Sequence, residues 1–276
     1  MLDNKEDAIP LQSFDEIIDW QKIEDNTWSG KINNSWMQGR SAFGGIPTGV
    51  ALKVLLEQCN HEKQQRPLSM AVSFLAPITN NIAYLQIRCL RKGKYIEHWE
   101  GEIRQDQQIK YRFLATLGFD RDSYLQASPP QPPKIQPPTE LLKLPYIPNV
   151  TPAFTQHYDY RWAQNYFPFS GSTERSFCGW IRPKKNCEPS ESLIASLLDA
   201  WPPPILLRAK KPVPASTITW HIHFVQPITQ STWWIYQATT QVAHNGYSNM
   251  TDFLWDENNN LIAQSQQVIA EFSKKQ

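Results

Sequence analysis

Glycine and net charge are both scarce in this chain of 276 residues. It has 11 glycines, about 4% against a usual value of roughly 7%. The glycine-rich motifs that bind phosphates, GxGxxG and GxxxxGK[ST], are absent, and so are the hydrolase motifs GxSxG and HExxH. The formal net charge is +1, from 27 Lys and Arg against 26 Asp and Glu. Because nucleic-acid binding needs a basic surface, we expect no nucleic-acid partner.

Cysteine pairs and long apolar runs are missing as well. The four cysteines form no CxxC pair and lie on apolar segments, which predicts buried thiols in a reducing compartment. No window approaches the roughly 18 apolar residues of a membrane-spanning helix, and the acidic residues 1–10 do not resemble a signal peptide. His221 and His223 have the spacing of metal ligands, but no convincing third ligand follows. We therefore expect a cytoplasmic protein without a membrane span, a metal or another cofactor.

Proline is the residue in excess, with 22 in the chain, and eight of these lie between residues 129 and 148. Proline lacks an amide donor and fixes φ, so this segment is excluded from a helix or a central strand. We interpret it as a semi-extended linker. The sequence then divides into an N-terminal repeat at 1–125, a proline-rich linker at 126–150 and a C-terminal repeat at 151–276.

The two parts on either side of this linker resemble each other. Residues 73–79 read SFLAPIT and residues 223–229 read HFVQPIT, with four of seven positions identical at a spacing of 150. Residues 53–59 correspond to residues 195–201 at a spacing of 142. Spacings that change only where a loop can absorb the difference indicate a duplicated unit.

Each unit is predicted to begin with a helix. Apolar residues recur at helical spacing between Val50 and Cys59. The matching helix is expected to begin after Ser190 or Ser192 as its cap and to end before Pro202.

Strands are predicted to follow each helix. Residues 68–74 and 218–224 alternate between apolar and polar side chains, as strands with one buried face do. Two strands around a polar turn at residues 256–260 predict a C-terminal hairpin. A helix covered by a curved antiparallel sheet, twice over, is an α+β architecture.

This arrangement, with the segment GRSAFGG at residues 39–45 ahead of the first helix, resembles the double-hotdog acyl-CoA thioesterases of the thioesterase II (TesB-like) family. The resemblance covers the chain from about Trp28 to Phe272. It implies a double hotdog, in which each of two repeats has a long helix wrapped by a curved antiparallel β-sheet. It also implies an acyl-CoA substrate and possible assembly into homo-oligomers.

The resemblance also implies a site in the second repeat, because members of that family use an Asp, a Thr and a Gln there to hold the attacking water. These map onto Asp199 near the end of the second helix, Thr217 at the start of the next strand and Gln267 in the last strand. Gln266 is the alternative to Gln267, because a shift of one residue puts the other side chain on the face of the site. Thr217 lies on the face of its strand opposite to the apolar side chains. An inward Thr217 therefore requires a β-bulge or a strand edge.

Thioester hydrolysis is chemically consistent with these residue types. It needs a water aimed at the carbonyl carbon, a carboxylate to accept its proton and donors for the developing oxyanion. Asp199, at the end of the apolar run 193–198, is expected to be partly desolvated, which raises its pKa. Backbone N–H groups at a helix start lack partners within the helix, so Gly44 and Gly45 are candidate substrate-binding residues that polarise the carbonyl.

The first repeat has Glu57, Pro67 and Ala115 at the corresponding positions. It keeps a carboxylate and loses both polar groups that would orient water. We therefore expect one working site, in the C-terminal repeat, and one degenerate site. The leading hypothesis is an acyl-CoA thioesterase that hydrolyses a fatty or other acyl-CoA thioester. A non-catalytic acyl-thioester-binding protein and a hotdog-fold acyl-CoA hydratase or dehydratase are the alternatives.

Overall fold

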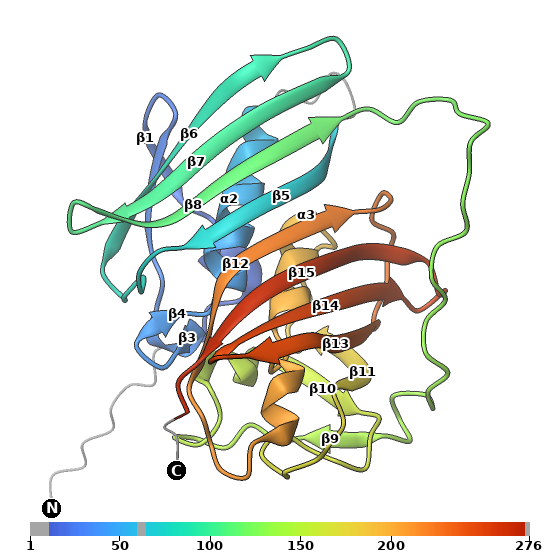
Figure 1. Cartoon of the computed structure of the whole chain (residues 1–276). Helices are drawn as coiled ribbons and strands as arrows, with labels where there is room; N and C mark the ends of the chain where they lie inside the picture. The colour runs from blue at the N-terminus through green and yellow to red at the C-terminus, as the bar shows by residue number, and fades with distance from the viewer. Residues whose placement is uncertain (1–10, 60–64, 274–276) are drawn as a thin grey trace, which may run out of the picture.

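A computed structural model describes residues 11–59 and 65–273. One continuous antiparallel sheet of 13 strands wraps around two central helices (Figure 1). The strands follow the order β1-β2-β6-β7-β8-β5-β12-β15-β14-β13-β11-β10-β9, so each half of the chain contributes one side of the sheet. This confirms the predicted α+β double hotdog. Among the described residues, no helix has both the length and the apolar character needed to cross a bilayer.

The N-terminal half builds its part of the sheet around helix α2, Gly45–Gln58. A single turn, α1 at Phe14–Ile17, precedes the first hairpin, and the 3-10 turn η1 at Asn34–Trp36 follows it. The strands of this half are β1 (Gln21–Glu24), β2 (Thr27–Lys31), β5 (Arg66–Phe74), β6 (Ile82–Lys92), β7 (Ile96–Gln105) and β8 (Gln108–Gly118), with the small separate pair β3 (Met37–Gln38) and β4 (Ser41–Ala42).

The C-terminal half repeats this plan around the shorter helix α3, Glu191–Asp199. Ser190 is its N-cap and accepts from the backbone N–H of Leu193, which settles the choice between the two predicted caps. The 3-10 turns η3 (Ala153–His157) and η4 (Pro204–Arg208) lie in its connections. Its strands are β9 (Leu142–Leu144), β10 (Tyr158–Trp162), β11 (Ser176–Pro183), β12 (Ala215–Phe224), β13 (Trp234–His244), β14 (Tyr247–Asp256) and β15 (Leu261–Glu271).

The two halves join where β5 pairs with β12, from Thr219 opposite Ser73 to His223 opposite Ser69. Both strands carry a bulge at the same place relative to their partners. In β12 the pairing with β15 shifts between Thr217 and Thr219, and in β5 the pairing with β8 shifts between Pro67 and Ser69. The duplication predicted from the sequence is therefore visible in the register of the sheet.

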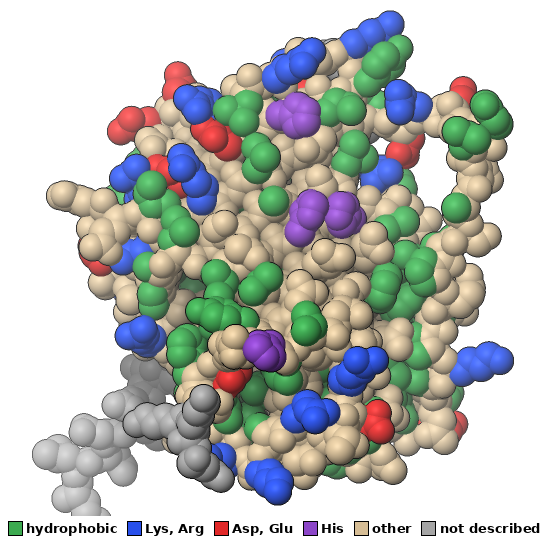
Figure 2. Space-filling view, viewed as in Figure 1, with side chains coloured by type: hydrophobic (Ala, Val, Ile, Leu, Met, Phe, Trp, Pro, Cys, Tyr) green, Lys and Arg blue, Asp and Glu red, His purple; other side chains and the backbone are tan. Residues whose placement is uncertain are grey.

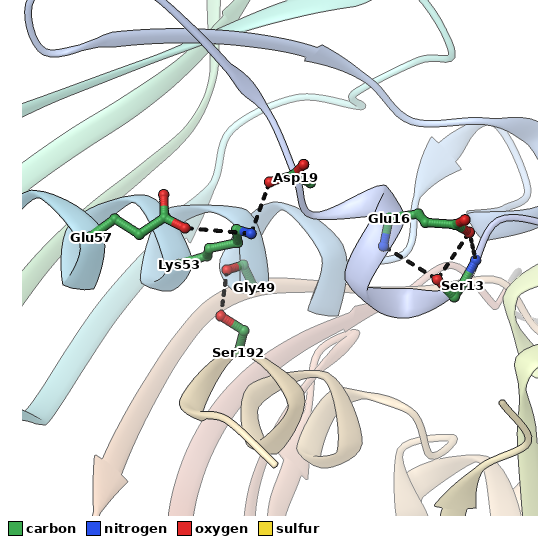
Figure 3. A network of polar contacts seen from close by, with 7 residues as sticks. All are labelled: Ser13, Glu16, Asp19, Gly49, Lys53, Glu57 and Ser192. Atoms are coloured by element: carbon green, nitrogen blue, oxygen red, sulfur yellow. Dashed lines mark hydrogen bonds and ion pairs between the residues drawn. The ribbon is translucent and has the colours of Figure 1, made fainter. Parts of the chain in front are cut away.

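The two helices pack antiparallel through small residues. The Oγ of Ser192 donates a 2.8 Å hydrogen bond to the carbonyl of Gly49 (Figure 3). A Cβ at Gly45 would lie 2.8 Å from the Cα of Ser196, closer than side-chain atoms approach a backbone. This close packing brings the beginning of α2 against the end of α3, where the site lies.

The proline-rich segment runs along the edge of the C-terminal half as an extended strap (Figure 1). Residues 119–141 form neither helix nor strand, as predicted, and β9 then adds a short edge strand to β10. Two tryptophans hold the segment: Trp180 Nε1 donates to the carbonyl of Gln136 at 2.9 Å, and Trp255 Nε1 donates to that of Pro130 at 3.0 Å. The division at 125/126 and 150/151 stays a prediction.

Candidate active site

Asp199 is the last residue of α3 and faces the first turn of α2. The backbone N–H of Gly45 is directed at its carboxylate. A Cβ at Gly44, the N-cap of α2, would lie 2.8 Å from Asp199 Oδ2 and 3.0 Å from Phe74 Cζ. A side chain at position 44 would therefore have to displace the Asp199 carboxylate or the Phe74 ring, although the backbone angles there suit any residue.

The environment of Asp199 makes its carboxylate basic. Burial, and then the charge of Asp252, raise its pKa to about 8, against the opposing effect of the Gly45 N–H. The raised pKa predicted from the sequence is thus present, but its second cause, a neighbouring carboxylate, was not foreseen.

Thr217 and Gln267 contact each other in the same cavity wall as Asp199. The bulge between Thr217 and Thr219 turns Thr217 toward the interior, as its position in the strand requires, and its Oγ1 donates to Gln267 Oε1 at 2.8 Å. Gln267 is only 4% exposed, whereas Gln266 points to the exposed outer face of the sheet. The register therefore selects Gln267 over Gln266.

These side chains line one cavity of about 650 Å³. Asp199, Thr217, Gln267 and Gly44 all contribute to its wall, while Gly45 stays behind it, between Phe43 and Ser196. The rest of the wall is largely apolar and includes Arg40, Phe74, Trp201, Met250 and Ile269. A pocket with a few converging polar groups in an apolar wall is the usual form of a small-molecule site.

Asp252 is a polar residue of this region that the sequence analysis missed. It lies on the inner face of β14 and is fully buried, with Oδ1 accepting a hydrogen bond from Ser265 Oγ. Burial raises its pKa to about 7 although hydrogen-bond donors from Ser265 and Gln267 oppose the shift. The sequence does carry a signal for Asp252. This residue alternates with Met250 and Leu254 along the strand, and the spacing places an acid on the same inward face as two apolar residues.

The corresponding positions of the N-terminal half form no such cluster. Pro67 and Ala115 take the places of Thr217 and Gln267 in the register of the sheet. Glu57 is exposed on α2 and pairs with Lys53 at 3.4 Å, and Lys53 also reaches Asp19 (Figure 3).

Metal-binding side chains do not gather in the described part of the chain. His221 and His223 lie side by side on the outer face of the sheet, with ring centroids 4.3 Å apart. The Lys and Arg side chains visible on this face are spread around it rather than collected in one patch (Figure 2).

Comparison with known proteins matches both halves of the chain. The model of the acyl-CoA thioesterase N-terminal domain matches residues 32–118, and that of the C-terminal domain matches residues 131–270. The chain belongs to the acyl-CoA thioesterase family. The resemblance to TesB-like proteins drawn from the sequence is confirmed, although no curated protein matches the sequence significantly.

Solved structures share the fold of this acyl-CoA thioesterase family member at low sequence identity. A hot dog fold protein of unknown function from Alicyclobacillus acidocaldarius is 19% identical, with a TM-score of 0.83 over 95% of this chain and 98% of that one. A TesB protein from Mycobacterium avium subspecies paratuberculosis is 13% identical (TM-score 0.78, 94% and 98% covered). An acyl-CoA thioesterase II from Mycobacterium marinum is 15% identical (TM-score 0.76, 95% and 99% covered).

Proposed function

We propose that this protein hydrolyses an acyl-CoA thioester to the free acid and CoA. The observation that carries the proposal is the convergence of Asp199, Thr217 and Gln267 on one cavity of about 650 Å³. The three residues come from three separate elements, α3, β12 and β15. A carboxylate, a hydroxyl and an amide are together sufficient to hold a water in one orientation.

Hydrogen-bond direction gives each group a role. Because the Thr217 hydroxyl donates to Gln267 Oε1, its remaining lone pairs accept a hydrogen from the water. The second hydrogen of the water is directed at Asp199, whose raised pKa suits it as a general base. The lone pair of the water oxygen is then free to attack the carbonyl carbon of the thioester.

The reaction proceeds through one tetrahedral intermediate. As the new C–O bond forms, Asp199 takes the proton of the water and the carbonyl oxygen becomes an oxyanion. Collapse of this intermediate breaks the C–S bond, and protonated Asp199 returns the proton to the leaving thiolate. Gly44 is the candidate donor to the oxyanion, because it lines the cavity at the start of α2 and its N–H takes part in no hydrogen bond among the described residues.

A panel of acyl-CoA thioesters from acetyl to long-chain fatty acyl, assayed by release of free thiol, tests this function. We expect turnover by the wild type and a loss of at least about a hundredfold in Asp199→Ala, the lower range for removal of a general base. Equal turnover by the variant would overturn the assignment of the site. Tight acyl-CoA binding without thiol release would instead indicate a binding protein, and addition of water to an enoyl-CoA without thiol release would indicate a hydratase.

A further inference from the structure

A buried polar network lies behind the site, and its central residue is Asp252. We propose that Asp252 is a positioning residue that fixes the amide orientation of Gln267 and, through it, the direction of the Thr217 hydroxyl. This proposal rests on the hydrolytic function proposed above. It assigns to Asp252 no contact with the substrate, because the residue does not line the cavity.

The network is anchored by a group that can only donate. Trp220 Nε1 donates to Ser265 Oγ at 2.8 Å, and a tryptophan N–H has no acceptor capacity. The single hydroxyl proton of Ser265 is therefore available for Asp252, and it is donated to Oδ1. Asp252 is thus held as an acceptor from one side, which favours its ionised form despite complete burial.

The other oxygen of Asp252 lacks such a donor in the described part of the chain. Oδ2 is buried and accepts no hydrogen bond of normal geometry among the described residues, although the Gln267 amide lies near enough to lower the pKa of this carboxyl. A carboxylate attracts the NH₂ end of an amide and repels its oxygen. Gln267 therefore turns Nε2 toward Asp252 and leaves Oε1 for the Thr217 hydroxyl, the orientation seen in the structure.

This orientation decides which way the catalytic water is held. With Oε1 toward Thr217, the Thr217 hydroxyl donates its proton to the amide and accepts a hydrogen from the water. If the amide were reversed, Nε2 would donate to Thr217 Oγ1, and the threonine proton would turn to the water. The water would then accept a hydrogen bond with the lone pair that it needs for attack.

The charge of Asp252 also acts on Asp199 directly, raising the pKa of that carboxyl. The other titratable groups around Asp199 are tyrosines whose pKa burial holds above its ordinary value, so they stay neutral. Within the described part of the chain, the one cation that lines the cavity is Arg40. The tyrosines are Tyr111 on β8, Tyr158 and Tyr160 on β10, and Tyr236 on β13.

The N-terminal half shows what the same sheet does without this network. Gly101 takes the place of Asp252, and Phe113 takes that of Ser265, in the pairing of β7 with β8. A Cβ at Gly101 would lie 2.4 Å from Phe113 Cε1, so the aromatic ring fills the space that the carboxylate occupies in the other half. Apolar packing is thus sufficient for this position of the fold, and the polar network belongs to the half that contributes Asp199, Thr217 and Gln267 to the cavity wall.

The test is Asp252→Asn, which keeps the shape and removes the charge. We expect kcat to fall about tenfold to a hundredfold, the range for partners that orient a functional residue, with KM nearly unchanged. We also expect the acid limb of the pH–rate profile to move to lower pH, because Asp199 loses the negative charge that raises its pKa. A side chain that only fills space would not move that limb.

Asp256→Asn is the matched control. Asp256 is equally buried on the same strand, but it accepts from the backbone N–H groups of Asn258 and Asn260 in the turn beyond β14. This variant should keep the wild-type pH profile. Ser265→Ala should change kcat in the same direction as Asp252→Asn, and circular dichroism and thermal melting will establish that each variant is folded.

The outcomes separate this inference from the function on which it rests. Wild-type hydrolysis that is lost in Asp199→Ala, together with an unchanged kcat and pH profile in folded Asp252→Asn, would overturn the role of Asp252 alone. No hydrolysis by the wild type would overturn the proposed function. If Asp252→Asn fails to fold, wild-type kcat and pH profile in folded Ser265→Ala would contradict the proposal.

Discussion

The inner faces of the two halves share one backbone plan and differ in a few side chains. Around the bulge of β12, the C-terminal half places Thr217, Gln267 and Asp252. Around the bulge of β5, the N-terminal half places Pro67, Ala115 and Gly101. The carboxylates at the ends of the two helices also differ. Asp199 faces the first turn of the other helix, whereas Glu57 is exposed and paired with a lysine.

The difference shows that this fold does not need polar residues in its interior. The N-terminal half packs its equivalent positions with apolar groups, and Phe113 and Leu117 are almost completely buried there. Burying a carboxylate without full pairing costs stability, so residues such as Asp199 and Asp252 are expected to be kept for chemistry. The predictions below compare equivalent positions of the two halves.

The largest effect is expected at Phe113 and its counterpart Ser265. Phe113→Ala should lower the free energy of unfolding by about 3–5 kcal/mol, because it leaves a cavity in a packed interior. The folded variant should hydrolyse thioester within about twofold of the wild type. Ser265→Ala should cost about 1–3 kcal/mol for each of the two buried groups left without a partner and, unlike Phe113→Ala, should slow hydrolysis.

Urea unfolding and thiol-release rates of the two variants measure this contrast. If Phe113→Ala slowed hydrolysis while folded, the N-terminal interior would contribute to the reaction and the division between the halves would be wrong.

The second largest effect is expected when a residue of the C-terminal half is replaced by the one at the equivalent position of the N-terminal half. Gln267→Ala introduces the side chain that Ala115 has in the N-terminal half. We expect kcat to fall about a hundredfold, as for a small misplacement of a reacting group, because Thr217 alone no longer fixes the water. Steady-state kinetics on the best thioester of the panel will measure it, and a loss confined to KM would show that Gln267 only binds substrate.

The smallest effect is expected in how the stability of the folded protein changes with pH. The pKa of Asp252 is raised to about 7 in the folded protein and lies near 3.8 when the chain is unfolded. The neutral form is thus favoured on folding, so Asp252 makes the wild type lose stability as pH rises from about 4 through 7, and Asp252→Asn lacks this contribution. Each pKa unit corresponds to about 1.4 kcal/mol.

Unfolding of the wild type and Asp252→Asn at pH 4.5 and pH 8 measures this effect. From pH 4.5 to pH 8, the free energy of unfolding of the variant minus that of the wild type should increase by more than about 1 kcal/mol. A difference independent of pH would mean that folding does not raise the pKa of Asp252.

Most of the fold could be predicted from the sequence because the signals are local and occur twice. The two helices, the strand blocks at 68–74 and 218–224 and the last hairpin carry periodicity, caps and turn residues that single windows reveal. Asn259 and Asp106, for instance, adopt the left-handed conformation that their turns require. The continuous sheet across β5 and β12 was not predicted, since strand pairing between repeats leaves no local pattern.

The site was predicted in part for the same reason. Asp199, Thr217 and Gln267 are candidates that the resemblance supplied, and strand alternation required a bulge or a strand edge at Thr217, of which the structure has the bulge. Asp252 was missed because its importance depends on contacts with other strands, where Ser265 and Gln267 approach it. The separate positions of Gly44 in the cavity wall and Gly45 behind it depend likewise on how the two helices cross.

The central claim is that the C-terminal half of this pseudo-symmetric fold supplies the side chains that hold and activate the water, and parallel assay of two isosteric variants tests it directly. Asp199→Asn and Glu57→Gln each neutralise the helix-end carboxylate of one half. Thiol release measured at pH 8 on the same thioester should fall at least about a hundredfold in Asp199→Asn and stay at the wild-type rate in Glu57→Gln. Equal rates in the two variants, or a loss in Glu57→Gln instead, would contradict the account.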